Sequence, residues 1–216
     1  MNKKLFAVVC IALLVLSFAA ARVINLSVGP SFSFYTGKFP LDEEGSATGA
    51  YKGTGFGLDT AFDLTFGERA ELYFQDSILF SGKAPSAHSI EGYDYATIDY
   101  KSHVGFEFAV LTTPVKVSVG AGIAAEFIAV AALEKPAREE GSMVLIMNVG
   151  VGGTAKVEYQ LANNWSAYFK VYADYMFATG VTGSNIPVPE GYQPPVYGGS
   201  YGNFSLDASA GIIFHF

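Results

Sequence analysis

The sequence is poor in cysteine and in charge, and both shortages exclude classes of protein. Charged residues make up 15% of the 216 residues and hydrophobic residues 50%, whereas about a quarter of the residues of ordinary soluble domains are charged. This composition is too apolar for a disordered chain. The only cysteine, Cys10, lies in an N-terminal apolar segment, so the remainder forms neither disulfides nor cysteine-ligated metal sites. The net charge of −7 argues against nucleic acid as a partner.

Long apolar runs are also missing, except for one at the N-terminus. Lys3 and Lys4 precede an apolar stretch that ends in the small residues 19–21. This is the layout of a secretory signal peptide, and it is short for a retained anchor helix, which is the alternative. We expect residues 1–21 to be cleaved before Arg22 and residues 22–216 to form one exported domain.

Alternation of apolar and polar residues dominates the rest of the chain. It follows period two in the segments 24–34, 56–66, 71–80, 98–108, 115–127, 145–159, 165–177 and 204–216. This period is typical of β-strands with one apolar and one polar face. The 24 glycines, 18 phenylalanines and 13 tyrosines also favour strands over helices.

The lengths of the connections distinguish a soluble barrel or sandwich from a membrane barrel. Short turns at 67–69, 112–114 and 162–164 alternate with long polar connections at 36–53, 81–94, 131–143 and 178–202. Outer-membrane barrels have short turns at one end and long loops at the other. The sequence therefore predicts an all-β fold, an eight-stranded antiparallel up-and-down transmembrane β-barrel. A soluble secreted barrel is the alternative.

Aromatic residues of the apolar faces gather near the predicted strand ends, as expected for girdles at two membrane interfaces. The predicted aromatic girdle consists of Phe34, Phe56, Phe66, Phe80, Phe127, Tyr159, Trp165, Phe177 and Phe204.

The last strand carries a family pattern. It alternates and ends on a C-terminal Phe, with a second aromatic residue two positions earlier. This resembles the assembly signal of outer-membrane barrels, here Phe204, Leu206, Ile212, Phe214 and Phe216. Together with the signal peptide and eight strands, the chain resembles the small OmpA-, OmpX- and OmpW-like barrels. The resemblance implies a place in the outer membrane of a diderm bacterium, contact with its lipid, and recognition of the last strand by the barrel-assembly machinery.

The polar faces of the strands predict an acidic lumen. Its predicted charge network consists of Asp59, Asp63, Glu71, Asp99, Lys101, His103, Glu107, Lys116, Glu126, Lys156, Glu158, Lys170, Asp174 and Asp207. One interpretation is a pathway that favours cations. The interpretation we favour is a salt-bridged plug, because eight strands leave little space beyond side chains and buried charges need partners.

Asp76 breaks the pattern, because its parity points it toward lipid. Reflection across the turn at Glu68 places it opposite Thr60, and Ser102 of the next strand comes close. A β-bulge or a hydrogen-bonded polar spot is the structural interpretation. The functional alternative is a lateral opening or a lipid-contact site.

The predicted function is structural and interactive. The loops at 36–53 and 178–202 are the expected contact sites for host or surface proteins, and the alternative is a narrow pore or a lateral channel for small or apolar molecules, as the OmpW-like resemblance implies. No cofactor or metal site is predicted. His88, with Ser86 and Glu91, lies in a long loop without fixed geometry, so we predict no enzymatic activity.

Overall fold

The computed structural model describes residues 23–40, 48–81, 95–132, 143–184, 197–199 and 202–216. The predicted signal peptide and the His88 loop lie outside these residues. The strands are β1 Val23–Pro40, β2 Thr48–Phe66, β3 Ala70–Ser81, β4 Tyr95–Leu111, β5 Val115–Ala132, β6 Met143–Ala162, β7 Trp165–Ser184, β8 Tyr197–Gly199 and β9 Asn203–His215. None of the described residues belongs to a helix long and apolar enough to cross a membrane.

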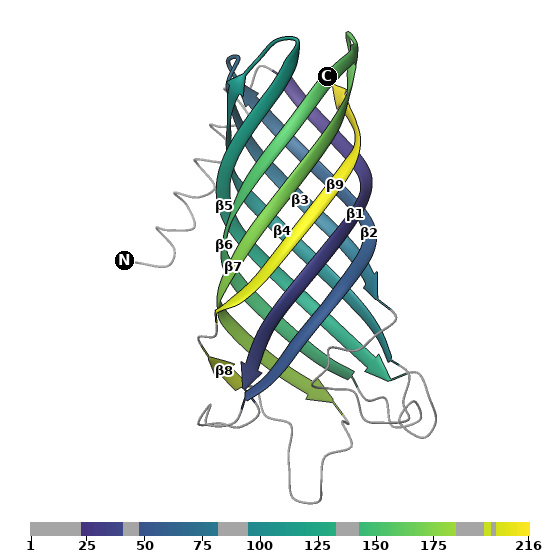
Figure 1. Ribbon diagram of the computed structural model, residues 1–216, viewed down its shortest axis with the longest axis vertical. Helices are drawn as coiled ribbons and strands as arrows, with labels where there is room; N and C mark the ends of the chain where they lie inside the picture. The colour runs from purple at the N-terminus through teal and green to yellow at the C-terminus, as the bar shows by residue number, and fades with distance from the viewer. Residues whose placement is uncertain (1–22, 41–47, 82–94, 133–142, 185–196, 200–201) are drawn as a thin grey trace, which may run out of the picture.

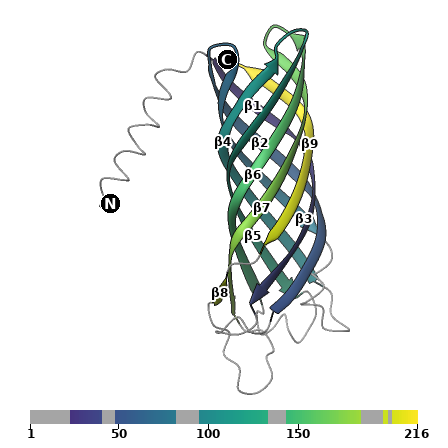
Figure 2. The same ribbon diagram turned by 60° about the vertical axis from the view of Figure 1, so that its left-hand side comes forward.

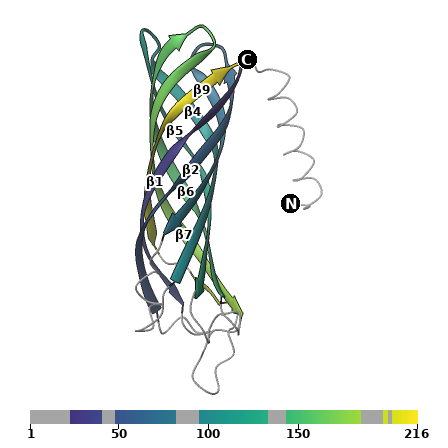
Figure 3. The same ribbon diagram turned by 90° about the vertical axis from the view of Figure 1, so that its right-hand side faces the viewer.

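The strands close into a barrel (Figure 1). Each of β1 to β7 pairs antiparallel with the next, and β9 pairs with both β7 and β1. Eight long strands thus form a ring without a free edge, while the three-residue β8 pairs with β7. Figures 2 and 3 show the same tilted strands from two other sides. The predicted eight-stranded antiparallel barrel is confirmed.

Tight turns mark one end of this barrel, which we call the turn end. They connect β2 to β3, β4 to β5 and β6 to β7, and Gly67 adopts a φ of 68° that glycine tolerates best. The C-terminus lies at the same end (Figure 1). The opposite end, where β8 lies, is called the loop end (Figure 2).

The distribution of side chains is that of a barrel turned inside out relative to a soluble one. The outward residues Phe56, Phe106 and Ile123 are each 63% exposed, whereas the inward Lys101 and Asp174 are 0% exposed. A soluble protein seldom leaves so much contiguous apolar surface in water. This outer face is the one expected for a barrel surrounded by lipid, and it contradicts the soluble alternative.

Several connections are shorter than the sequence predicts. β1 continues to Pro40 and β2 begins at Thr48, so most of the predicted loop 36–53 is a hairpin stem with Thr36 paired to Lys52. Likewise β7 continues to Ser184 and β8 occupies part of the predicted loop 178–202. The ladder continues because main-chain hydrogen bonds do not require alternating side chains.

Candidate functional site

Every residue of the predicted charge network lies on the inner face of the barrel. Most of these side chains are almost completely buried, and Lys116 keeps 19% of its side chain exposed. The contacts divide the network into two clusters. The turn-side cluster consists of Asp63, Glu71, Glu107, Lys116, Glu158, Lys156 and Lys170; the loop-side cluster consists of Asp99, Lys101, His103, Glu126, Asp174 and Asp207. Asp59 is held separately by hydrogen bonds from Gln75 and Ser77.

Lys156 is the centre of the turn-side cluster. Its Nζ lies 2.7 Å from Glu71 Oε2, 2.9 Å from Glu107 Oε2 and 3.3 Å from Asp63 Oδ2. These acids come from β3, β4 and β2, whereas Lys156 belongs to β6, so the contacts cross the lumen instead of following one strand pair. The cross-links fill the interior with partnered charges.

The other two lysines complete this cluster. Lys116 Nζ donates a hydrogen bond to Glu71, and Lys170 Nζ lies 2.5 Å from Glu107 Oε1. The ammonium of Lys170 also lies 4.4 Å from the ring centre of Tyr73 and 4.7 Å from that of Tyr172. Each lysine therefore has a carboxylate partner, and one of them is also held between aromatic faces.

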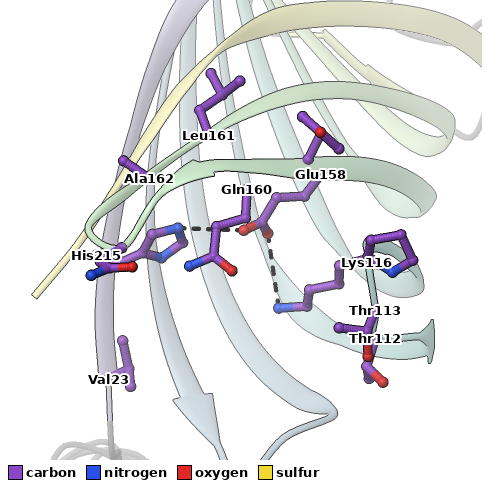
Figure 4. Close-up of a pocket in the computed structure, with 12 residues that line it drawn as sticks. Val23, Thr112, Thr113, Lys116, Glu158, Gln160, Leu161, Ala162 and His215 are labelled. Carbon is purple, nitrogen blue, oxygen red and sulfur yellow. Dashed lines mark ion pairs between the residues drawn. The ribbon is translucent and has the colours of Figure 1, made fainter.

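A recess with a mixed polar and apolar lining opens at the turn end beside this cluster (Figure 4). Its volume is about 650 Å³, and Glu158 lies in it between His215 and Lys116. The Glu158 carboxylate is 3.4 Å from His215 Nε2 and 4.0 Å from Lys116 Nζ. His215 Nδ1 is 2.8 Å from Asn25 Oδ1, so the recess ends on partnered side chains.

Lys101 is the centre of the loop-side cluster. Its Nζ donates to Asp207 Oδ1 at 2.8 Å and lies 3.2 Å from Glu126 Oε1. Asp99 Oδ2 is 3.7 Å away, and neither Asp99 oxygen accepts a hydrogen bond from the described residues. The Lys101 ammonium thus forms ion pairs with carboxylates from β4, β5 and β9.

His103 and Asp174 form the second half of this cluster. His103 Nε2 is 2.7 Å from Asp174 Oδ2, and the His103 ring stacks on Tyr172 with ring centres 4.8 Å apart. Ligand atoms of His103, Asp174 and Asp207 lie within 4.8 Å of one another. Parity predicted these residues on one face, but the strand-to-strand distances that bring them together are not visible in the sequence.

Sequence reasoning missed neutral partners of these charges. Asn148 donates to Glu126 at 2.6 Å and accepts from Thr179 and Asn203, while Ser33 accepts from Lys101. It also overlooked Tyr73 and Tyr172, because it assigned aromatic residues to the membrane interfaces. Their positions in the polar register of β3 and β7 were the signal that could have found them.

Asp76 lies on the outer face, as parity predicts. The register pairs it with Thr60 on one side and Ser102 on the other, without a shift that would indicate a bulge. Tyr100 Oη donates to Asp76 Oδ1 at 2.7 Å, a partner that the sequence analysis did not identify. The bulge interpretation is therefore wrong at this position, and a hydrogen-bonded polar spot describes it.

The residues of the predicted aromatic girdle belong to the outward register. β1, β5 and β7 continue past Phe34, Phe127 and Phe177, so these rings lie inside the strands and not at their ends. The outward register also includes the five residues of the predicted assembly signal, and Phe216 is 75% exposed.

Solved structures of outer-membrane proteins share this fold, and two of them align over most of this chain. The outer membrane protein OprG of Pseudomonas aeruginosa aligns over 91% of this chain and 97% of its own, with a TM-score of 0.64 and 11% identity. A major outer membrane protein from Thermus thermophilus aligns over 87% and 99%, with a TM-score of 0.52 and 16% identity. No protein-family model and no characterised protein sequence matches the chain. The chain therefore has the fold of small outer-membrane barrels.

Proposed function

We propose that this protein is an integral barrel of the outer membrane of a diderm bacterium whose lumen is plugged by its own side chains. In this proposal residues 1–21 direct export and are removed before Arg22, and the C-terminal strand presents the signal to the barrel-assembly machinery. The apolar outer face and the fold shared with outer-membrane proteins support this location.

The ion pairs that cross the lumen are the main support for a lumen filled by side chains. Lys156 joins β6 to β2, β3 and β4, and Lys101 joins β4 to β9 through Asp207. Eight strands enclose an interior that side chains alone can fill. Breaking buried pairs of this kind leaves uncompensated charge, so the network resists opening.

Conductance measurements test the plug. The purified full chain in planar bilayers is expected to show no steady single-channel steps. A variant with Glu71→Ser, Glu107→Ser and Lys156→Ser is expected to conduct, because it removes the cross-links and their volume together. Steady conductance of the wild type would contradict the plug and support the narrow-pore alternative.

If the lumen is closed, other molecules contact the protein from outside the barrel. We assign these contacts to two of the four connections at the loop end, 41–47 between β1 and β2 and 185–196 between β7 and β8. The corresponding test is the adhesion of diderm cells that display the protein to cultured epithelial cells. Deletion of 185–196 is expected to reduce adhesion several-fold, and deletion of 82–94 is the matched control. Unchanged adhesion after both loop deletions, 41–47 and 185–196, would contradict the surface role.

A further inference from the structure

The loop-side cluster contains more buried carboxylates than cations. Asp99, Glu126, Asp174 and Asp207 are each at most 3% exposed, and the basic side chains of the described residues that contact them are Lys101 and His103. Burying a carboxylate without a partner is strongly unfavourable. This end of the lumen therefore has a place for additional positive charge.

One part of the cluster has the composition of a metal site. Ligand atoms of His103, Asp174 and Asp207 lie within 4.8 Å of one another, and His103 Nε2 is already 2.7 Å from Asp174 Oδ2. Ligands about 2.0 to 2.2 Å from a tetrahedral ion lie roughly 3.4 Å apart, so binding would bring the most distant pair closer by up to about 1.4 Å and move His103 Nε2 and Asp174 Oδ2 slightly apart. One imidazole and two carboxylates suit a divalent first-row transition ion such as Zn²⁺, whose charge two carboxylates neutralise.

The two ligands from β4 and β7 are held in place by their surroundings. The His103 ring is stacked on Tyr172 with an angle of 23° between the ring planes. Asp174 lies against Gly152 of β6, where any Cβ would collide with its Oδ1, and its Oδ2 accepts a hydrogen bond from Ser205 at 3.3 Å. A ligand set fixed in this way loses little conformational freedom when an ion binds.

Asp207 has to exchange its present partner for the ion, and the structure contains an acceptor for that partner. Lys101 Nζ donates to both Asp207 oxygens, at 2.8 and 3.1 Å. Asp99 Oδ2 lies 3.7 Å from the same ammonium, and both Asp99 oxygens are buried without a donor among the described residues. A movement of Nζ by about 1 Å would give Lys101 a hydrogen bond to Asp99 and release an Asp207 oxygen.

From these contacts we infer that the loop-side cluster binds one divalent transition-metal ion through His103, Asp174 and Asp207. Asp99 acts as a positioning residue that takes over Lys101 when the ion is bound. This role accounts for a buried carboxylate that accepts no hydrogen bond from the residues the structure describes. The inference departs from the sequence-based prediction, which contained no metal site.

The experiment measures Zn²⁺ bound to the purified full chain in detergent micelles. The protein is unfolded, stripped with a chelator, refolded with excess Zn²⁺ and freed of loosely held ion by gel filtration, so that access to the buried site does not limit loading. We expect one retained Zn²⁺ per chain by elemental analysis. His103→Gln and Asp174→Asn are expected to weaken binding by about 100-fold, and Asp99→Asn by about tenfold.

The other histidines provide matched controls. The sequence contains three, and His215 lies at the turn end while His88 is outside the described residues. His215→Gln and His88→Gln should therefore retain the ion. Heat-modifiable migration in gels verifies that each variant has folded.

Two results would overturn the inference. One is a folded wild type that retains no Zn²⁺; the other is retention that is lost in the His88 or His215 variant but kept in His103→Gln. Neither bears on the plug, which depends on the turn-side cluster and is read out as conductance.

Discussion

The turn-side and loop-side clusters are built from the same kinds of side chain in different proportions. On the turn side, Lys116, Lys156 and Lys170 each contact at least one acid. On the loop side, Lys101 is the one lysine of the described strands that forms ion pairs with Asp99, Glu126 and Asp207. Both clusters occupy the same lumen, so the difference is not a matter of burial.

The different ratio of acids to cations suggests different roles: buried charge stabilises the structure in one cluster and binds a ligand in the other. Lysines and carboxylates in near balance can stabilise a closed interior if their hydrogen bonds are satisfied. An unbalanced set is less stable in isolation, and such local costs gather where a protein binds something. The turn-side cluster therefore accounts for closure, and the loop-side cluster is where we look for binding.

The largest expected effect comes from removing the central cation of the turn-side cluster. Lys156→Met keeps much of the volume but leaves Asp63 without its only ion-pair partner among the described residues. We expect the free energy of unfolding to fall by about 3–5 kcal/mol. Urea titration of the protein refolded into lipid vesicles measures this change.

Two further variants isolate the cause of that loss. Lys52→Met changes an exposed lysine that lies over the Phe34 ring, and its effect should stay within about 0.5 kcal/mol. Adding Asp63→Asn to Lys156→Met should recover part of the stability, because it removes the orphaned charge. A Lys156→Met protein as stable as the wild type would mean that the turn-side cluster does not hold the lumen closed.

The fold could be predicted almost completely from the sequence, because strand parity is a local property. Alternation assigns each residue to the inside or the outside as soon as one position is fixed. It therefore predicted the inward Asp59 and Lys101 and the outward Phe56 and Asp76. It missed the ends of β1 and β2 around Thr36 and Lys52, where the main chain continues to pair although alternation weakens.

The pairing inside the site could not be predicted, because it depends on the tilt and stagger of the closed barrel. Lys156 meets Glu71 across strands that are not neighbours, at a sequence separation of 85. His103 and Asp174 are separated by 71 residues and meet only because β4 and β7 face each other across the lumen. The alternation along each strand identifies which residues point into the lumen, whereas the closure of the barrel determines which of them contact one another.

A smaller effect of opposite sign is expected in the loop-side cluster. Asp99→Asn removes a carboxylate that accepts no hydrogen bond from the described residues and lies in the same cluster as Glu126 and Asp207. In the metal-free protein we expect it to raise the free energy of unfolding by up to about 2 kcal/mol. Asp63→Asn is the matched substitution in the turn-side cluster, and it should destabilise because Asp63 is paired with Lys156.

The same urea titration compares these two variants directly. Opposite signs would support the distinction between a balanced and an unbalanced cluster. If both substitutions destabilised the barrel equally, the loop-side cluster would be as well compensated as the turn-side one, and the comparison would fail.

Asp76 extends the comparison from the lumen to the outer wall, where the smallest effect is expected. Among the described residues Tyr100 is the side-chain donor to its carboxylate, which is flanked along β3 by the outward Phe74 and Ile78. Lipid-facing acids cost less than buried ones because they reach the interface or become neutral, so Asp76→Leu should stabilise by about 1 kcal/mol or less. Tyr100→Phe, alone and combined with Asp76→Leu, completes a double-mutant cycle for the hydrogen bond. Asp76→Leu could instead lower the stability by more than the coupling energy of this cycle. That result would mean that the carboxylate has a partner on the lipid side and that the outer wall also contains a site.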